Sequence, residues 1–179
     1  MARGKSVFGI YFTRSNVESA VTALKHAAFS SSDVSVLLPE SIETGQVATE
    51  QSTKAPEGAA VGVGSGAAVG GALGWLVGVG ALAIPGIGPV IAAGPLVAAL
   101  AGIGIGGAFG GFAGSLVGMG IPEYEAKKYE GELLKGGILV VVHCETYEEV
   151  DRAKQALQAN GAQDIAISQE TSSEAQNAA

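Results

Sequence analysis

The sequence predicts an α+β fold in which a small four-stranded sheet is interrupted by a long helical hairpin. Two apolar stretches, 7–12 and 137–144, are typical of central strands, and each precedes an amphipathic helix and a second, more polar strand. Of the 28 glycines in this 179-residue chain, 21 lie between Gly58 and Gly120. No Asp, Glu, Lys or Arg occurs from Gly58 through Pro122.

The first half of the sheet is expected within residues 1–40. Residues 7–12 are β-branched and aromatic, which is typical of a strand buried on both faces. Ser15 and Glu18 have the spacing of a capping box and predict the start of a helix. Residues 33–38 alternate at first and end at Pro39, which predicts a strand nearer the edge of the sheet.

The second half of the sheet is expected within residues 122–168. Pro122 opens a connecting helix, and residues 137–144 form a second central strand. Thr146 and Glu149 form another capping box, and a short strand over 164–168 closes the pattern. Two βαβ halves of this kind predict the split βαβ sheet of the ferredoxin-like fold, with the first and third strands in the middle.

Two polar segments flank these elements. Residues 41–57 are rich in Ser, Thr, Gln and Glu and predict a flexible linker. Residues 169–179 have a similar composition and predict a disordered tail.

Residues 58–121 predict a glycine-zipper α-helical hairpin. Glycine recurs at every fourth position on both sides of a break at Ile84–Pro89. Glycine destabilises a helix in water by roughly 1 kcal/mol relative to alanine, so such helices need an environment that stabilises them in another way. Rows without side chains let two helix backbones approach closely. The residues expected in helix packing and oligomerisation are Gly62, Gly66, Gly70, Gly74, Gly78, Gly102, Gly106, Gly110, Gly114 and Gly118.

The leading interpretation is that this hairpin inserts into a lipid bilayer, so that the chain is a membrane-associated structural protein that self-associates through its glycine rows. A helix over 58–83 would extend ~39 Å at ~1.5 Å per residue, against a hydrocarbon core of ~30 Å, and a second arm over 95–120 is similar. The lysines at 54, 127, 128 and 135 lie outside the two arms. By the positive-inside rule, both termini are then expected in the cytoplasm.

Two other interpretations remain open. A homo-oligomer free in solution, including a large particle, could bury the hairpins in a common core, because glycine and alanine make these arms less hydrophobic than ordinary membrane spans. Alternatively, the ferredoxin-like sheet could be a module that senses a small ligand, although no concave polar site is evident in the sequence.

The sequence predicts no enzyme. The net charge of −7 argues against nucleic-acid binding. His143 and Cys144 are adjacent, but the other histidine, His26, lies on the first helix, so no metal or nucleophilic site is expected. The glycine pattern of residues 102–107 lacks the strand that precedes a dinucleotide-binding loop. We therefore expect no catalytic residue, cofactor or metal. The expected partners are other copies of the chain and the lipid bilayer, and the sequence does not identify a further protein partner.

The order of these parts resembles the bacterial heat-induced or general stress protein domain family, which also occurs in low-temperature-induced proteins. The resemblance includes the strand at 7–12, the glycine-rich hairpin after a polar linker, and the segment 120–130 (GIPEYEAKKYE) leading into 135–142 (KGGILVVV). It covers residues 7 to about 168. It implies a role in stress physiology and supplies no catalytic residue.

Overall fold

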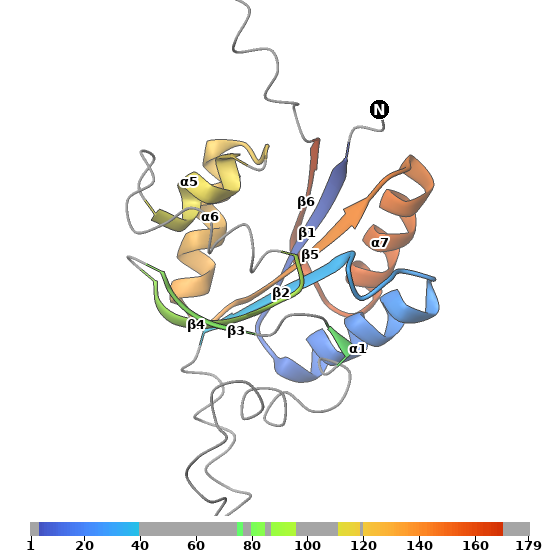
Figure 1. Cartoon of the computed structure of the whole chain (residues 1–179), viewed down its shortest axis with the longest axis horizontal. Helices are drawn as coiled ribbons and strands as arrows, with labels where there is room; N and C mark the ends of the chain where they lie inside the picture. The colour runs from blue at the N-terminus through green and yellow to red at the C-terminus, as the bar shows by residue number, and fades with distance from the viewer. Residues whose placement is uncertain are drawn as a thin grey trace, which may run out of the picture.

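The computed structural model describes residues 4–39, 75–76, 80–84, 87–95, 111–118 and 120–169. These residues form one antiparallel sheet with helices on both faces, which makes the chain an α+β protein (Figure 1). The strands are β1 (Lys5–Tyr11), β2 (Val34–Pro39), β3 (Gly80–Ile84), β4 (Gly88–Ala93), β5 (Ile138–Cys144) and β6 (Gln163–Gln169). The helices are α1 (Arg14–His26), α5 (Gly111–Gly118), α6 (Glu123–Leu134) and α7 (Tyr147–Ala159).

The six strands lie in the order β3-β4-β2-β5-β1-β6. The two most apolar strands of the predicted halves, β1 and β5, are paired in the interior, as the sequence predicts. The prediction that residues 33–38 lie nearer the edge is wrong. β2 pairs with β5 on one side and with β4 on the other, so its six residues are all buried.

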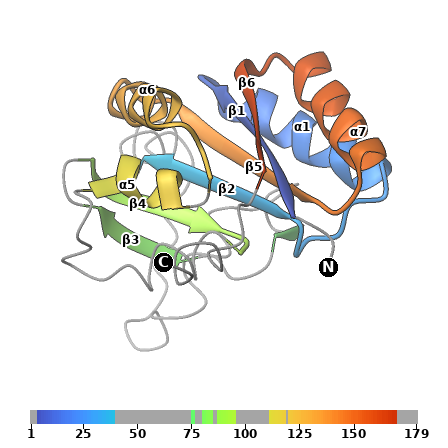
Figure 2. The same cartoon turned by 90° about the horizontal axis from the view of Figure 1, so that it is seen from above.

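Helices α1 and α7 pack on one face of the sheet, called the α1/α7 face, and α5 and α6 pack on the other, the α5/α6 face (Figure 2). Side chains alternate between the two faces along each strand. Along β5, Val140 and Val142 belong to the core of the α1/α7 face, whereas Leu139 and Val141 belong to that of the α5/α6 face. This burial on both sides explains the nearly continuous apolar sequences of β1 and β5.

The two capping predictions have different outcomes. Thr146 caps α7, since its Oγ1 accepts a hydrogen bond from the N–H of Glu149 at 3.2 Å, as the sequence predicts. The prediction for α1 is wrong. Thr13 is its N-cap, and the N–H of Asn16 donates to Thr13 Oγ1 at 3.4 Å, whereas Ser15 lies inside the helix. Threonine and serine are both favoured N-cap residues, and the spacing to Glu18 pointed to the wrong one.

The largest departure from the sequence analysis lies in the charge-free segment. The prediction of a helical arm over 58–83 is wrong at the C-terminal end of that arm, because residues 80–84 form β3. The break at 84–89 is not the distal tip of a helical hairpin. It joins β3 to β4 as a β-hairpin that extends the sheet beyond β2, and Ile84 is buried in the core of the α5/α6 face. Val90 and Ile91 are β-branched and favour a strand, which is the local signal that the glycine periodicity obscured.

Other predicted segments lie outside the described residues. These are the polar linker 41–57, most of the first glycine-rich arm, residues 96–110 of the second arm, and the tail from 170 to 179.

Candidate functional site

The ten glycines predicted to pack helices are only partly within the described structure. Gly114 and Gly118 lie on α5, and the other eight lie outside the described residues. The role of the eight therefore remains a prediction. They are Gly62, Gly66, Gly70, Gly74, Gly78, Gly102, Gly106 and Gly110.

Helix α5 turns its large side chains toward the sheet and leaves part of its glycine row on the outside. Phe112 and Leu116 are fully buried in the core of the α5/α6 face. A Cβ atom at Gly118 would meet nothing within 4 Å, and the neighbouring Val117 is 41% exposed. The bare backbone at Gly118 therefore faces away from the sheet.

The predicted second arm is not one continuous helix from 95 to 120. Gly111, the first residue of α5, has φ +87°, which is outside the helical range and marks the start of a separate helix. The carboxylate of Glu130 on α6 accepts a hydrogen bond from the N–H of Ala113 at 3.0 Å, which satisfies one of the free amides of this first turn. At the other end, Gly120 also has a positive φ.

The strand pairing brings the ends of the two glycine-rich stretches together. Gly80, where the chain enters β3, is the direct partner of Ala92, next to the last residue of β4. Gly94 then approaches β2 so closely that an added Cβ would lie 2.1 Å from the carbonyl oxygen of Val34. The missing side chain of Gly94 thus serves sheet packing. The stretch before Gly80 and the stretch after Gly94 meet the sheet at one place.

His143 and Cys144 do not form a joint site, because consecutive strand residues point to opposite faces. Cys144 lies in the core of the α1/α7 face, and its Sγ donates to the carbonyl of Val142 at 3.7 Å. Burial raises the pKa of the Cys144 thiol to about 12, so it stays protonated at neutral pH. His143 Nδ1 lies 3.1 Å from Ser6 Oγ on the neighbouring strand, while the exposed His26 lies on α1.

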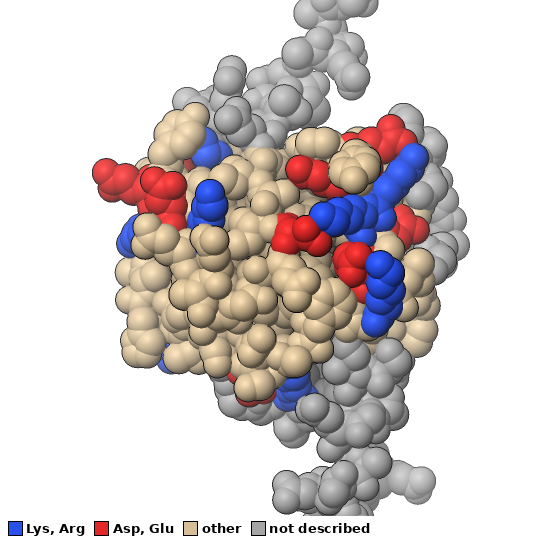
Figure 3. Space-filling model, turned by 180° about the vertical axis from the view of Figure 1, so that it is seen from behind, with Lys and Arg blue, Asp and Glu red and all other residues tan. Residues whose placement is uncertain are grey.

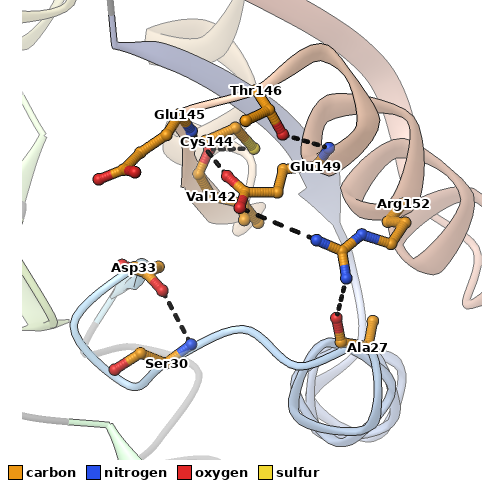
Figure 4. A network of polar contacts seen from close by, with 9 residues as sticks. All are labelled: Ala27, Ser30, Asp33, Val142, Cys144, Glu145, Thr146, Glu149 and Arg152. Carbon is orange, nitrogen blue, oxygen red and sulfur yellow. Dashed lines mark hydrogen bonds and ion pairs between the residues drawn. The ribbon is translucent and has the colours of Figure 1, made fainter. Parts of the chain in front are cut away.

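A polar network surrounds the start of α7 (Figure 4). One guanidinium nitrogen of Arg152 donates to the carbonyl of Ala27, at the end of α1, at 3.0 Å. Another lies 3.8 Å from Oε1 of Glu149. The other carboxylate oxygen of Glu149, Oε2, accepts a hydrogen bond from the N–H of Glu145 at 2.7 Å. In the same view, the carboxylate of Asp33 accepts from the N–H of Ser30 at 2.8 Å. These contacts join two helices and close a turn, which is a structural role.

A second group of contacts, which sequence reasoning missed, joins α6 to β6. The Tyr129 hydroxyl donates to the backbone carbonyl of Asp164 at 2.6 Å, and Lys128 Nζ lies 2.5 Å from a carboxylate oxygen of the same residue. Asp164 has φ +50° and lies in a β-bulge opposite β1. No local pattern predicts this contact, because 35 residues separate Tyr129 from Asp164.

The described residues contain no group of three or more His, Cys, Asp or Glu side chains placed to hold a metal ion. Over the same described ranges, no helix combines the length and the hydropathy that crossing a membrane requires. Comparisons of the chain with protein-family models, with curated proteins and with solved structures give no match.

Proposed function

We propose that this chain is a non-enzymatic structural protein that assembles with copies of itself through its charge-free, glycine-rich segment. The pairing of Gly80 with Ala92 carries the proposal. It brings the stretch that ends at residue 79 close to the stretch that begins after Gly94. Two glycine rows that start side by side are well placed to dock against each other or against those of another copy.

The rest of the chain is proposed to be a ferredoxin-like frame that carries this segment. The strands β2, β5, β1 and β6 lie in that order, and the helices that follow β1 and β5 both pack on the α1/α7 face. This arrangement is what two split βαβ halves produce. The β3–β4 hairpin then adds two strands beyond β2, and α5 and α6 cover the face that this fold otherwise leaves open.

The positions of the strands favour association between copies over a membrane-spanning hairpin. β2 and β3 belong to one sheet, so the chain between Pro39 and Gly80 starts and ends on the same side of any bilayer that it meets. This part of the chain would therefore have to cross the bilayer twice. Residues 40–57, which make up its first part, carry several acidic residues and are unsuited to a crossing. The stretch 96–110 has 15 residues, fewer than the ~20 that one spanning helix needs.

The experiment that tests this proposal is light scattering on the full chain purified without detergent. We expect a uniform oligomer, and we expect Gly66→Leu combined with Gly70→Leu to reduce its mass. The matched control is Ala68→Leu combined with Ala72→Leu, which would add similar bulk on the opposite side of the helix that the glycine spacing predicts. A monomeric native chain, or equal effects of the two double substitutions, would contradict the proposal.

A second candidate is contact with a lipid surface, favoured by the absence of charge from Gly58 through Pro122. Flotation with vesicles tests it. If the chain floats with the vesicles and the two glycine substitutions abolish flotation, the segment acts in lipid. If the chain stays at the bottom as an oligomer, assembly between copies is its function. A role in bacterial stress response is proposed only from the resemblance of residues 7–168 to that family.

A further inference from the structure

The connection between α7 and β6 contains a dipeptide that can react with itself, Asn160–Gly161. Glycine has no side chain, so little hinders its backbone nitrogen from attacking the side-chain amide of a preceding asparagine. The molecule seen from behind has a broad area without Lys, Arg, Asp or Glu (Figure 3). Residues 155–163 also carry no charged side chain that could assist or oppose the attack. The reactivity of the pair therefore depends on how the turn holds it.

The reaction is spontaneous deamidation, with water as the co-reactant. The Gly161 nitrogen loses its proton and forms a bond to Cγ of Asn160, and the bond from Cγ to the side-chain nitrogen breaks. That nitrogen leaves as ammonia. Water then opens the resulting succinimide ring at either of its carbonyl carbons, which gives aspartate or isoaspartate. The reaction needs no oxidant, reductant or enzyme, and asparagine is among the thermolabile residues of proteins.

The folded turn holds both reacting groups by hydrogen bonds. Nδ2 of Asn160 donates to the carbonyl of Ala156 at 2.7 Å. The N–H of Gly161 donates to the carbonyl of Gln158 at 3.2 Å. The attack requires the Asn160 side chain to give up the first bond and the Gly161 nitrogen to give up the second, so both bonds oppose it. The turn must therefore open before Asn160 reacts.

The packing around the turn leaves its backbone little room to move. Gly161 has φ +85°, and a Cβ built on it would lie 3.1 Å from Nδ2 of Asn16 on α1. A Cβ built on Gly9 of β1 would lie 3.1 Å from the Cβ of Ala162. Two other elements, α1 and β1, thus lie close against the turn. Such close packing resists the backbone rotation that ring formation needs.

We infer that Asn160 is a deamidation site that the native turn keeps almost inert, and that its conversion weakens the end of α7. Asn160 is the C-cap of this helix, where the partial charge of the helix end is negative. Aspartate has no N–H to donate to the Ala156 carbonyl and adds a negative charge beside it. Isoaspartate also adds a carbon to the main chain of a closely packed turn. Because the reaction releases ammonia, it does not reverse, and it marks a chain in which this turn has opened.

Peptide mapping by mass spectrometry tests the protection of Asn160. The full chain is incubated at mildly alkaline pH, once in native buffer and once in urea above the unfolding midpoint, and aspartate and isoaspartate at position 160 are quantified. A synthetic peptide of residues 155–165 in the same two buffers corrects for the effect of urea on the chemistry. We expect conversion in the native chain to be slower by a factor on the order of 10 or more, because only open chains react. Equal corrected rates would overturn the inference.

The same substitution at opposite ends of two helices tests the effect of conversion. Asn160→Asp should lower the equilibrium constant for folding by about 10-fold, since it removes a hydrogen-bond donor and places a negative charge at a helix C-terminus. Asn16→Asp is the matched control, because Asn16 lies in the first turn of α1, where a negative charge is favourable. Urea denaturation of both variants gives the two constants. Equal losses in the two variants, or no loss in Asn160→Asp, would refute the inference. Neither measurement depends on the glycine-rich segment.

Discussion

The hydroxyl of Tyr129 donates to the backbone carbonyl of Asp164 at 2.6 Å, and this bond ties α6 to the bulged start of β6. The Tyr129 ring also stacks against Phe8 of β1, with 6.2 Å between the ring centroids. One side chain thus holds a covering helix, a central strand and an edge strand together.

Removal of this hydroxyl should be costly. Tyr129→Phe leaves the Asp164 carbonyl without its donor and should lower the free energy of unfolding by about 1–2 kcal/mol. Tyr124→Phe is the control, because Tyr124 lies on the same helix and is 81% exposed. Urea denaturation of both variants measures the difference, and equal midpoints would show that the Tyr129 bond contributes nothing.

The protein should lose stability at alkaline pH. Burial raises the pKa of Tyr11 and Tyr129 above the ordinary value of 10.0, and raises that of Cys144 to about 12. The folded state therefore keeps protons that the unfolded chain releases, and the stability that these groups provide is complete below about pH 9 and lost as the pH rises further.

Each such group should contribute a slope of up to about 1.4 kcal/mol per pH unit above its unfolded pKa. Denaturation curves between pH 7 and 11 measure this slope. Tyr129→Phe should make it shallower, whereas a slope that is the same in this variant and the native chain would contradict the explanation.

Gly88, the first residue of β4, and Gly94, which follows its last residue, should respond differently to alanine. Both have a positive φ, +97° at Gly88 and +86° at Gly94, so each alanine incurs a strain of about 1 kcal/mol. A Cβ at Gly88 has open space, whereas at Gly94 it would overlap the backbone of Val34. Gly94→Ala should therefore cost about 2–4 kcal/mol in total. Thermal denaturation of the two variants tests this, and similar melting temperatures would show that β4 does not lie against β2 as described.

A substitution just after the C-terminal end of α1 should stabilise the protein. Ala28 has φ +66°, and the N–H of Phe29 donates to the carbonyl of Leu24 at 3.1 Å, a pattern that usually places glycine at this position. Ala28→Gly should stabilise the protein by about 0.5–1 kcal/mol. Gly161 has the equivalent place after α7, so Gly161→Ala should change the unfolding midpoint in the opposite direction.

The N-cap of α1 can be identified by substitution. Thr13→Ala should cost about 1 kcal/mol, whereas Ser15→Ala should cost less than about 0.5 kcal/mol. Chemical denaturation gives both values. The reverse order would support the capping box that the sequence suggested at Ser15.

The sequence by itself determined the elements of the frame. The apolar stretches at 7–12 and 137–144 predicted β1 and β5 as interior strands, because a strand buried on both faces has no polar alternation. The capping box at Thr146 predicted the start of α7, because a cap depends only on residues within one turn.

Only the tertiary structure decided the fate of the charge-free segment. Its fourfold glycine spacing suggested two helices around a break at 84–89, yet Gly80–Ile84 and Gly88–Ala93 form strands, because β4 pairs with the edge of β2 and β3 pairs in turn with β4. At Gly94 there is no room for a side chain, because β2 lies against this residue. No local sequence pattern reveals this contact. The contacts of Tyr129 with Asp164 likewise depend on residues far apart in the chain. Local spacing predicts caps and periodic faces, whereas the choice between helix and strand here depended on which partner the backbone could reach.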